Sequence, residues 1–283
     1  LYFFHQDSAS CLNIWGRNFM HKLYIMLNVI GLISKIEIRF MSNKHWINLS
    51  KKNKSIYNKL FRFFNFSYAK KLIVINSRAY DLFSKNKFIK NEKYIVLLDE
   101  MLNDPQYVRL RGYIDKKKID THYKNLVEKL IIISKYYKKK VVICLHPSDD
   151  LNFKKKIFSH FLVKQHETKK YIYQSKLVLF FESSAIIDAI MLKKKIMTIF
   201  SNVLDINQIA HNMNYVNEMM IPSLNVDDDL LFEKNKINKF KYNKKKINFT
   251  YNKYIKKYIA ADTSNILGYK KFANIIKKEY FKS

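Results

Sequence analysis

The chain has 283 residues, 48% of them hydrophobic, with only 4 Gly and 3 Pro, which excludes a disordered or fibrous protein and predicts one large folded domain or two small ones. Its formal net charge of +30, from 53 Lys and Arg against 23 Asp and Glu, predicts a surface that attracts anions such as nucleic acid, anionic lipid or sugar nucleotides. The excess of Lys, Asn, Ile and Tyr is equally typical of an AT-rich genome, so charge alone does not choose the partner.

Residues 1–90 are predicted to form a short or incomplete α/β domain. Within them we expect a helix at Ile56–Phe64, a strand at Leu72–Ile75 and a strand remnant at Leu1–Phe4. The chain begins with Leu1 rather than Met, so we expect its N-terminus to be missing or trimmed, and no signal peptide is expected.

The early part of the chain also bears on its cellular compartment. The apolar run Leu23–Ser34 covers about 12 residues, whereas a membrane-spanning helix needs about 20, so we expect a buried helix there. Cys11 and Cys144 lie far apart and outside any C-x-x-C motif, which favours neither a disulfide framework nor a zinc knuckle. These features predict a cytoplasmic protein.

Residues 91–225 are predicted to form a Rossmann-like domain with a parallel sheet, because short apolar runs alternate with amphipathic segments. Each predicted strand is a continuous apolar run, as is typical of strands covered on both faces. The expected strands are Tyr94–Leu98, Val141–Leu145, Leu177–Phe181 and Ile196–Phe200. The expected helices are at about Asp120–Tyr137, Leu151–Phe161, Thr168–Gln174 and Ser183–Lys193.

Residues 226–283 are predicted to be a peripheral basic segment with a C-terminal helix. Asp227–Asp229 is interpreted as a solvated turn, Lys234–Lys257 as a strongly basic stretch, and about Ser264–Phe281 as a helix that packs on the body. The basic and aromatic residues of FKYNKKKINFTYNKYIKKY would suit nucleic acid or an anionic membrane surface, and a solvated basic face without a partner is an equally good interpretation.

Polar residues follow three of the four predicted strands at the point where each strand ends. They are Asp99 and Glu100, then His146 and Pro147, and then Glu182, Ser183 and Ser184. Because ligands of an open parallel sheet bind beyond the carboxyl ends of its strands, these residues are expected to meet at one site.

Two of these groups suit a phosphate or carboxylate. Ser183 and Ser184 lie where a strand turns into a helix, so their hydroxyls and the unpaired amides of the first turn favour an anion. His146 is held by the following Pro147 and can donate to a phosphate oxygen or protonate a leaving group. The alternatives are that one serine merely caps the helix and that His146 is structural.

The segments VVICLHP and, about 30 residues later, LVLFFESSAIIDAIMLKKKIMTIFS resemble the HP and SS motifs of bacterial sialyltransferases and of related polysialyl-, Kdo- and other nonulosonate-transferring enzymes of capsule and lipopolysaccharide synthesis. The segment beginning KYIVLLDEMLNDPQY is similar to the C-terminal domain of capsular-biosynthesis proteins of that group. The resemblance covers roughly Lys93–Ser201, about 40% of the chain.

This resemblance implies a GT-B-like fold of two Rossmann-like domains, with the acceptor side in residues 1–90 and the nucleotide on residues 91–225. It implies inverting, metal-independent transfer of an acidic sugar, sialic acid or a related nonulosonate, from CMP to a surface glycan or glycolipid, without a cofactor. Peripheral attachment to the inner face of the bacterial inner membrane would suit such an acceptor.

Site roles also follow from the resemblance. His146 would bind the CMP phosphate and act as the acid, while Ser183 and Ser184 would hold the phosphate or the sugar carboxylate. Asp99 is the candidate general base, with Glu100 second. The sequence departs from the pattern here, because the base motif of some sialyltransferases ends in glycine and this chain has Met101 after Glu100.

Other functions fit the sequence less well. Neither G-x-x-x-x-G-K-[ST] nor G-x-G-x-x-G is present, which disfavours a P-loop NTPase and a dinucleotide oxidoreductase. A nucleic-acid-binding protein is the main rival, but no helix-turn-helix, RRM or zinc finger is recognisable, so we expect no nucleic-acid partner. A non-catalytic glycosyltransferase relative is a third interpretation.

Overall fold

The computed structural model describes residues 36–41, 69–77, 80, 81, 83, 91–102, 114–181, 183–204, 206–228, 244–260 and 266–280. The chain divides into two compact units. The sheet unit is Lys87–Tyr251, and the terminal unit combines Leu1–Asn86 with Asn252–Ser283. Residues 226–283, grouped as one segment in the sequence analysis, are therefore divided between the two units. The elements expected at Leu1–Phe4, Leu23–Ser34 and Ile56–Phe64 lie outside the described residues.

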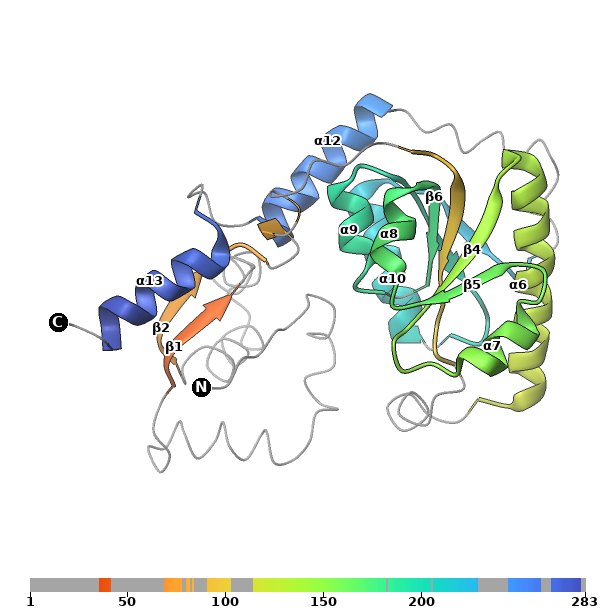
Figure 1. The fold of residues 1–283 in the computed structure, drawn as a ribbon, viewed down its shortest axis with the longest axis horizontal. Coiled ribbons are helices and arrows are strands. Elements are labelled where there is room, and N and C mark those ends of the chain that lie inside the picture. Colours follow the sequence, from red (N-terminus) through yellow and green to blue (C-terminus); the bar gives the residue numbers. More distant parts are fainter. Residues whose placement is uncertain are drawn as a thin grey trace. The chain divides into compact units, whose positions relative to one another are not determined.

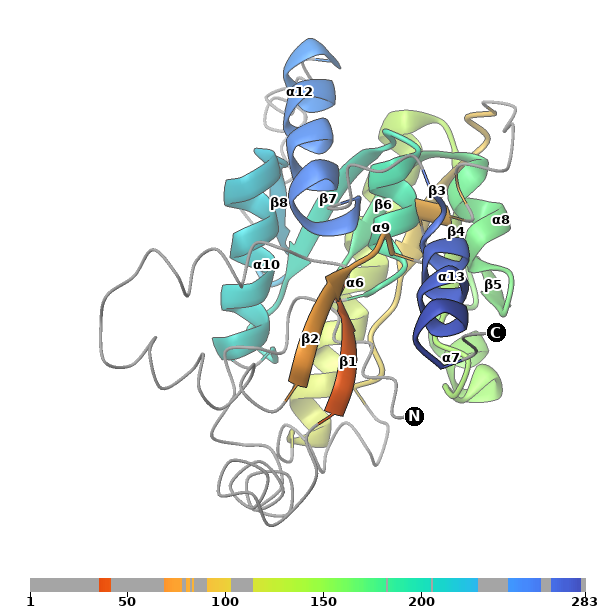
Figure 2. The same cartoon turned by 90° about the vertical axis from the view of Figure 1, so that its left-hand side faces the viewer.

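The sheet unit is built on a six-stranded sheet in which every neighbouring pair is parallel. Its strands are β3 (Tyr94–Leu98), β4 (Lys140–Leu145), β5 (Leu162–Gln165), β6 (Ser175–Phe180), β7 (Lys195–Phe200) and β8 (Ser223–Asn225). They lie in the order β5-β4-β3-β6-β7-β8, which can be followed across Figure 2. This order corresponds to the 3-2-1-4-5-6 order of the Rossmann fold, so the prediction of an α/β fold with a parallel, Rossmann-like sheet is confirmed.

Helices cover both faces of this sheet (Figure 1). They are α6 (Lys116–Tyr137), α7 (Leu151–Ile157), α8 (Thr168–Tyr173), α9 (Ile186–Met191) and α10 (Ile206–Met219). α6 and α7 lie on one side, and α8, α9 and α10 on the other. Ile95 and Leu97 belong to the same core cluster as Leu126 and Leu130 of α6, while the alternate residue Val96 is equally buried. Burial of both faces explains why the strands are continuous apolar runs.

The structure corrects several predicted boundaries. The helix expected to reach Phe161 ends at Ile157, and the short edge strand β5 follows. α9 begins at Ile186 rather than Ser183. Neither α10 nor β8 was predicted, because the many Asn residues of α10 obscure its helical pattern and β8 is only 3 residues long.

The terminal unit contains a parallel pair of strands and the last helix. β1 (Ile36–Met41) pairs with β2 (Ala69–Val74), which matches the strand expected near Leu72–Ile75, and α13 (Gly268–Tyr280) is the expected C-terminal helix. Asp81 caps α13, since its carboxylate accepts from the backbone N–H groups of Gly268 at 2.8 Å and Tyr269 at 3.0 Å. A side chain at Gly268 would collide with the backbone oxygen of Asn76, so this close approach requires glycine.

A further helix, α12 (Lys244–Tyr254), contains the boundary between the two units and continues into a π-helical turn, η3 (Ile255–Ile259). It accounts for the described part of the basic stretch. In the part of the chain that the structure describes, no helix is long and apolar enough to cross a membrane.

Candidate functional site

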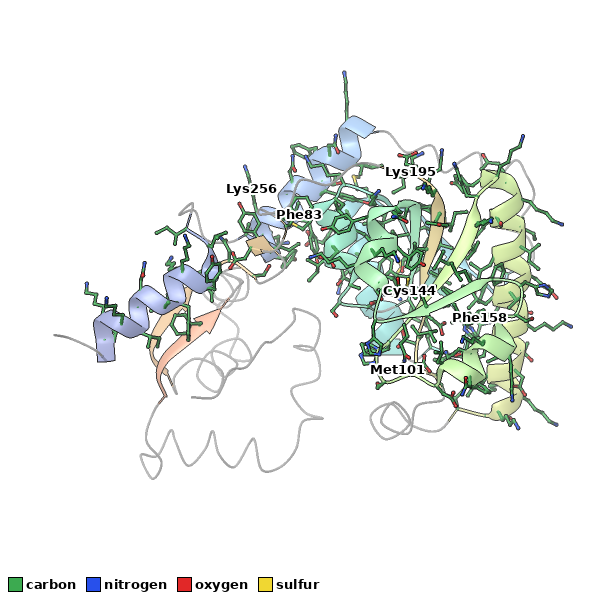
Figure 3. The ribbon with its side chains drawn as sticks, viewed as in Figure 1. Phe83, Met101, Cys144, Phe158, Lys195 and Lys256 are labelled. Atoms are coloured by element: carbon green, nitrogen blue, oxygen red, sulfur yellow. The ribbon has the colours of Figure 1, made fainter. Side chains whose placement is uncertain are left out.

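The topology brings the predicted site residues to one edge of the sheet. β4 and β6 both pair with β3, so the ends of these three parallel strands are neighbours at the carboxyl edge. The strand order reverses between β3 and β6, which is where an open α/β sheet leaves a crevice for its ligand. Strands lie about 4.8 Å apart, so the ends of β4 and β6 are roughly 10 Å from each other. In Figure 3, Met101 marks this edge, and Lys195, the first residue of β7, marks the opposite one.

His146 is exposed at the carboxyl end of β4, in the position predicted from the sequence. Its Nδ1 accepts from the backbone N–H of Ser148 at 3.3 Å and lies 2.8 Å from the Ser148 hydroxyl oxygen. An Nδ1 that accepts from an amide carries no proton in the neutral ring, so the proton lies on Nε2. Within the described residues no hydrogen bond engages Nε2. The ring therefore presents an N–H donor to solvent at the edge of the sheet.

The loop that carries His146 is held by Gln165, the last residue of β5. Its Nε2 donates to the backbone oxygens of His146 at 3.0 Å, Pro147 at 3.0 Å and Asp149 at 2.9 Å. The backbone N–H of Asp149 also donates to the His146 oxygen at 3.1 Å, which closes the turn. Sequence reasoning missed Gln165, because nothing in its neighbourhood distinguishes it from an ordinary edge-strand residue.

Lys154 of α7 is buried beneath the same loop. Lys154 lies on the same side of the helix as Phe158, four residues later. Because the Phe158 side chain is part of the core, the aliphatic part of the Lys154 side chain is buried beside it. Its ammonium donates to Asp99 Oδ2, to the Glu100 backbone oxygen at 2.9 Å and to the Tyr123 hydroxyl at 2.5 Å.

This ion pair corrects the expected role of Asp99. The side chains of Asp99 and Lys154 are both 0% exposed. A carboxylate enclosed in this way cannot reach the hydroxyl of an incoming acceptor, so Asp99 anchors the end of β3 instead of acting as an open general base. Glu100 is also buried, and its backbone oxygen accepts from Lys154.

One ammonium faces two carboxylates in this cluster. Asp149 Oδ2 lies 3.5 Å from Lys154 Nζ, close enough for an ion pair but long for a hydrogen bond. Burial raises the pKa of Asp149; Lys154 opposes that rise and Asp99 adds to it. Asp99 Oδ1 and Asp149 Oδ2 are both buried without a hydrogen bond. Lys154 thus ties the loop after β3 to the loop after β4. The Ser148 hydroxyl, which donates to the unprotonated His146 Nδ1 at 2.8 Å, also lies 3.4 Å from Met101 Sδ.

Ser183 and Ser184 lie at the end of β6 and differ in their surroundings. The Ser183 hydroxyl accepts from the backbone N–H of Ala185 at 3.3 Å, so this serine stabilises the turn that leads into α9. Ser184 is exposed, and its backbone oxygen accepts from Ile187 at 3.2 Å. Of the pair, Ser184 presents its hydroxyl to solvent. Glu182 lies outside the described residues.

A buried polar cluster that the sequence did not predict extends along the same edge. His122 Nδ1 lies 2.8 Å from Ser201 Oγ, and Ser201 donates to Asp227 Oδ2 at 2.9 Å. Asp227 also accepts from Asn125 Nδ2 at 3.1 Å and from the backbone N–H of Asn202 at 2.7 Å. The interpretation of Asp227 as part of a solvated turn was therefore wrong, because it fastens the end of β7 to α6.

The charge states in this cluster follow from burial. Burial lowers the pKa of His122 to about 4; Asp227 opposes that fall and Lys154 adds to it. Since Ser201 gives its proton to Asp227, neutral His122 donates through Nδ1, and its buried Nε2 is left without a partner. Burial alone would raise the pKa of Asp227, but its three hydrogen bonds lower it. In the described ranges no group of three or more His, Cys, Asp or Glu side chains could hold a metal ion.

Comparison with known proteins gives distant structural likenesses. No protein-family model and no curated protein matches the chain. It is similar to the UDP-GlcNAc 2-epimerase of Methanocaldococcus jannaschii in complex with UDP-GlcNAc and UDP, with 14% identity and a TM-score of 0.41 over 78% of this chain and 58% of that one. The chain thus spans less than two thirds of the length of the epimerase.

Two further solved structures resemble the chain. UGT89C1 of Arabidopsis thaliana, complexed with quercetin, has 8% identity and a TM-score of 0.45 over 92% of this chain and 70% of that one. WaaG, a glycosyltransferase involved in lipopolysaccharide biosynthesis, has 11% identity and a TM-score of 0.32 over 86% of this chain and 76% of that one. At such identities a likeness does not identify a substrate.

Proposed function

We propose that the chain is a glycosyltransferase of the two-domain GT-B type whose sheet unit binds a nucleotide-activated sugar at the carboxyl edge, next to His146. The observation that carries this proposal is the state of His146: an exposed ring with its Nδ1 occupied by Ser148 and its Nε2–H open to solvent. The His146 Nε2–H group lies beside the point where the strand order reverses, and a nucleotide phosphate is expected at that point.

The proposed chemistry uses His146 on the leaving group. Its Nε2–H would donate a hydrogen bond to a phosphate oxygen of the sugar donor and offset the charge that develops as the glycosidic bond breaks. When the ring is protonated on both nitrogens, it could also pass the Nε2 proton to the departing nucleotide and remain as neutral imidazole. Gln165 and Lys154 support this role, because they fix the two loops of the edge before any ligand arrives, and a preorganised donor needs no rearrangement during the reaction.

We further propose that the donor is a CMP-activated acidic sugar, a sialic acid or related nonulosonate, on the strength of the HP and SS motifs. The tertiary anomeric carbon of such a sugar ionises readily, so the enzyme must chiefly stabilise the departing phosphate, deprotonate the acceptor and exclude water. In this proposal transfer is inverting and needs no metal, and Ser184 holds the phosphate or the sugar carboxylate. Asp99 lies in a buried ion pair and Glu100 is buried as well, so the proposal assigns no general base. The acceptor would be a glycan or glycolipid at an anionic membrane surface.

Nucleotide binding tests the proposal first. Thermal-shift measurements with CMP, UDP, GDP and ADP should show stabilisation by one nucleotide, with CMP expected. Stabilisation by UDP alone would overturn the proposal of a CMP-activated donor and leave the glycosyltransferase class intact. No response to any nucleotide would overturn both the proposed donor and the proposed class.

Variants at the edge test the residue roles. His146→Ala should lower turnover by about 10²-fold or more by removing the proton donor, while Ser184→Ala should mainly raise the KM for the donor. His160→Ala is the matched control, since His160 is an exposed histidine of the same unit that lies after α7 and away from the edge. Equal turnover in His146→Ala and His160→Ala would remove His146 from the mechanism.

A further inference from the structure

Ser148 contacts the His146 ring through two of its groups. Its backbone N–H donates to His146 Nδ1 at 3.3 Å, and its hydroxyl oxygen lies 2.8 Å from the same nitrogen. The amide can only donate, so it favours an Nδ1 without a proton. The hydroxyl is both a donor and an acceptor, and its proton turns about the Cβ–Oγ bond. The shorter of the two contacts is therefore the one that suits Nδ1 with or without a proton.

A second acceptor lies next to the same hydroxyl. Met101 Sδ, in the loop after β3, is 3.4 Å from Ser148 Oγ (Figure 3 labels Met101). A thioether sulfur is a weak acceptor and cannot donate. While Nδ1 has a lone pair to offer, the Ser148 hydroxyl donates to this stronger acceptor. Once Nδ1 carries a proton, the hydroxyl can accept from Nδ1–H and give its own hydrogen bond to the sulfur.

Acid chemistry at His146 takes Nδ1 through both of these states. The resting neutral ring holds its proton on Nε2. To act as an acid, the ring takes a second proton from solvent at Nδ1 and then gives the Nε2 proton to a phosphate oxygen of the departing nucleotide. The neutral ring that remains holds its one proton on Nδ1. The partner of Nδ1 must therefore donate before this cycle begins and accept while it runs.

We propose that Ser148 is a positioning residue for His146 whose hydroxyl works as a rotor between His146 Nδ1 and Met101 Sδ. It donates to Nδ1 while the ring is neutral, and it turns to the sulfur and accepts from Nδ1–H when the ring is protonated. Only the O–H bond rotates, because Gln165 holds the backbone of the loop on both sides of Ser148. The proposal deepens the proposed function and rests on it only for the use of the proton, because the rotor itself needs no sugar donor.

Other charges near the loop stay constant in the test of this rotor. The charged groups on the elements around the loop are Asp149 and Asp150 of the loop, Asp99 and Glu100 after β3, Lys154, Lys155 and Lys156 of α7, and Lys164 and Glu167 beside β5. Lys154 is paired with Asp99 and lies 3.5 Å from Asp149 Oδ2. The substitutions at Ser148 and Met101 leave every one of these charges in place. A change in the protonation of His146 then reports the hydroxyl or the sulfur that was removed.

Two-bond proton–nitrogen NMR of the full chain with isotope-labelled histidine measures the protonation of each ring. The His146 signals are identified by their loss in His146→Gln, and all variants are compared at the pH where half of the wild-type His146 ring is protonated. Ser148→Ala should lower the ratio of protonated to neutral ring by about fivefold, because a hydrogen bond from a charged ring is about twice as strong as one to a neutral ring. A hydroxyl that only donates would give the opposite sign.

Three further variants complete the comparison. Ser148→Thr keeps a hydroxyl and should stay within about twofold of the wild type. Met101→Leu keeps an apolar side chain but removes the sulfur, and should lower the ratio by about two- to threefold. Ser134→Ala is the matched control, since the Ser134 hydroxyl donates to the Lys139 backbone oxygen at the end of α6, and it should leave His146 unchanged. The exposed His160 is the internal reference in every sample.

A higher or unchanged ratio in Ser148→Ala would overturn the rotor, and so would an equal fall in Ser134→Ala. An unchanged ratio in Met101→Leu would overturn the role of the sulfur. Nucleotide thermal shifts on the wild type separate these results from failure of the transferase proposal. If the ratios change as expected while no nucleotide binds, the rotor is retained and the proposed function is lost.

Discussion

Replacing Lys154 with methionine should destabilise the sheet unit strongly. The change keeps a long apolar stem but removes an ammonium that donates to Asp99, the Glu100 backbone oxygen and the Tyr123 hydroxyl. Asp99 is then left as a buried carboxylate without a counter-charge. Removing one partner of a buried ion pair costs about 3–5 kcal/mol. At about 2–4 °C per kcal/mol for a unit of this size, the Tm should fall by roughly 10 °C.

The pH dependence of this loss follows from the carboxylates. Burial raises the pKa of Asp149, and Lys154 opposes that rise. A group with a raised pKa in the folded state stabilises the fold at low pH and loses this contribution as the pH rises through that pKa. Without Lys154 no positive charge opposes the rise in the pKa of Asp149, so the cost of the variant should be largest near pH 7 and should shrink as the pH falls through that raised pKa.

Urea unfolding of both proteins, followed by circular dichroism at stepped pH, measures this cost. Lys155→Met is the control, since Lys155 is exposed on the same helix and should change the free energy of unfolding by less than about 0.5 kcal/mol. Adding Asp99→Asn to Lys154→Met should restore part of the stability by removing the stranded charge. A Lys154→Met protein as stable as Lys155→Met, or a loss that does not vary with pH, would refute the buried ion pair.

Three further predictions concern residues around the same edge. Since burial lowers the pKa of His122 from 6.5 to about 4, the unfolded chain takes up the proton first on acidification, so the wild type should lose stability between about pH 6.5 and 4; His122→Gln should flatten this slope in urea titrations, and an unchanged slope would contradict the assignment. Gln165→Met should speed hydrogen exchange of the amides of Ser148 and Asp149 by about tenfold at nearly constant Tm, whereas unchanged exchange would show that the loop does not depend on the Gln165 side chain. Burial raises the pKa of the Cys144 thiol to about 12, so Cys144 should resist iodoacetamide in folded Cys11→Ser protein at about pH 8 and react on unfolding; rapid labelling of the native state would refute its burial.

A local sequence pattern predicts the role of some residues at the carboxyl edge of the sheet but not of others. The position of His146 followed from one apolar strand and the proline after it, and the structure places it exposed at that strand end. The sequence gives only a weak indication that Asp99 is enclosed. It continues the alternation of Ile95 and Leu97 toward the α6 side, and Lys154 falls in the spacing of Leu151 and Phe158 on one face of α7. These periodicities point both side chains to the same layer, but they do not give the distance between them.

The contacts of Gln165 and Asp227 had no local signal at all. Gln165 binds a loop up to 19 positions earlier in the chain, and Asp227 binds Asn125, which is 102 positions away. Both contacts exist only because parallel strands β5 and β8 deliver their carboxyl ends to the same edge as β4 and β7.

The sequence by itself determined the α/β class, the four central strands and the edge to which the polar residues belong. Continuous apolar runs in the strands and the 3.6-residue period of apolar side chains in the helices are local properties that burial imposes on each element. Only the tertiary structure decided which of those polar residues face solvent and which are buried and paired in the core. Solvation and pairing depend on neighbours brought together by the crossover helices, and so Asp99 became an anchor while His146 remained open.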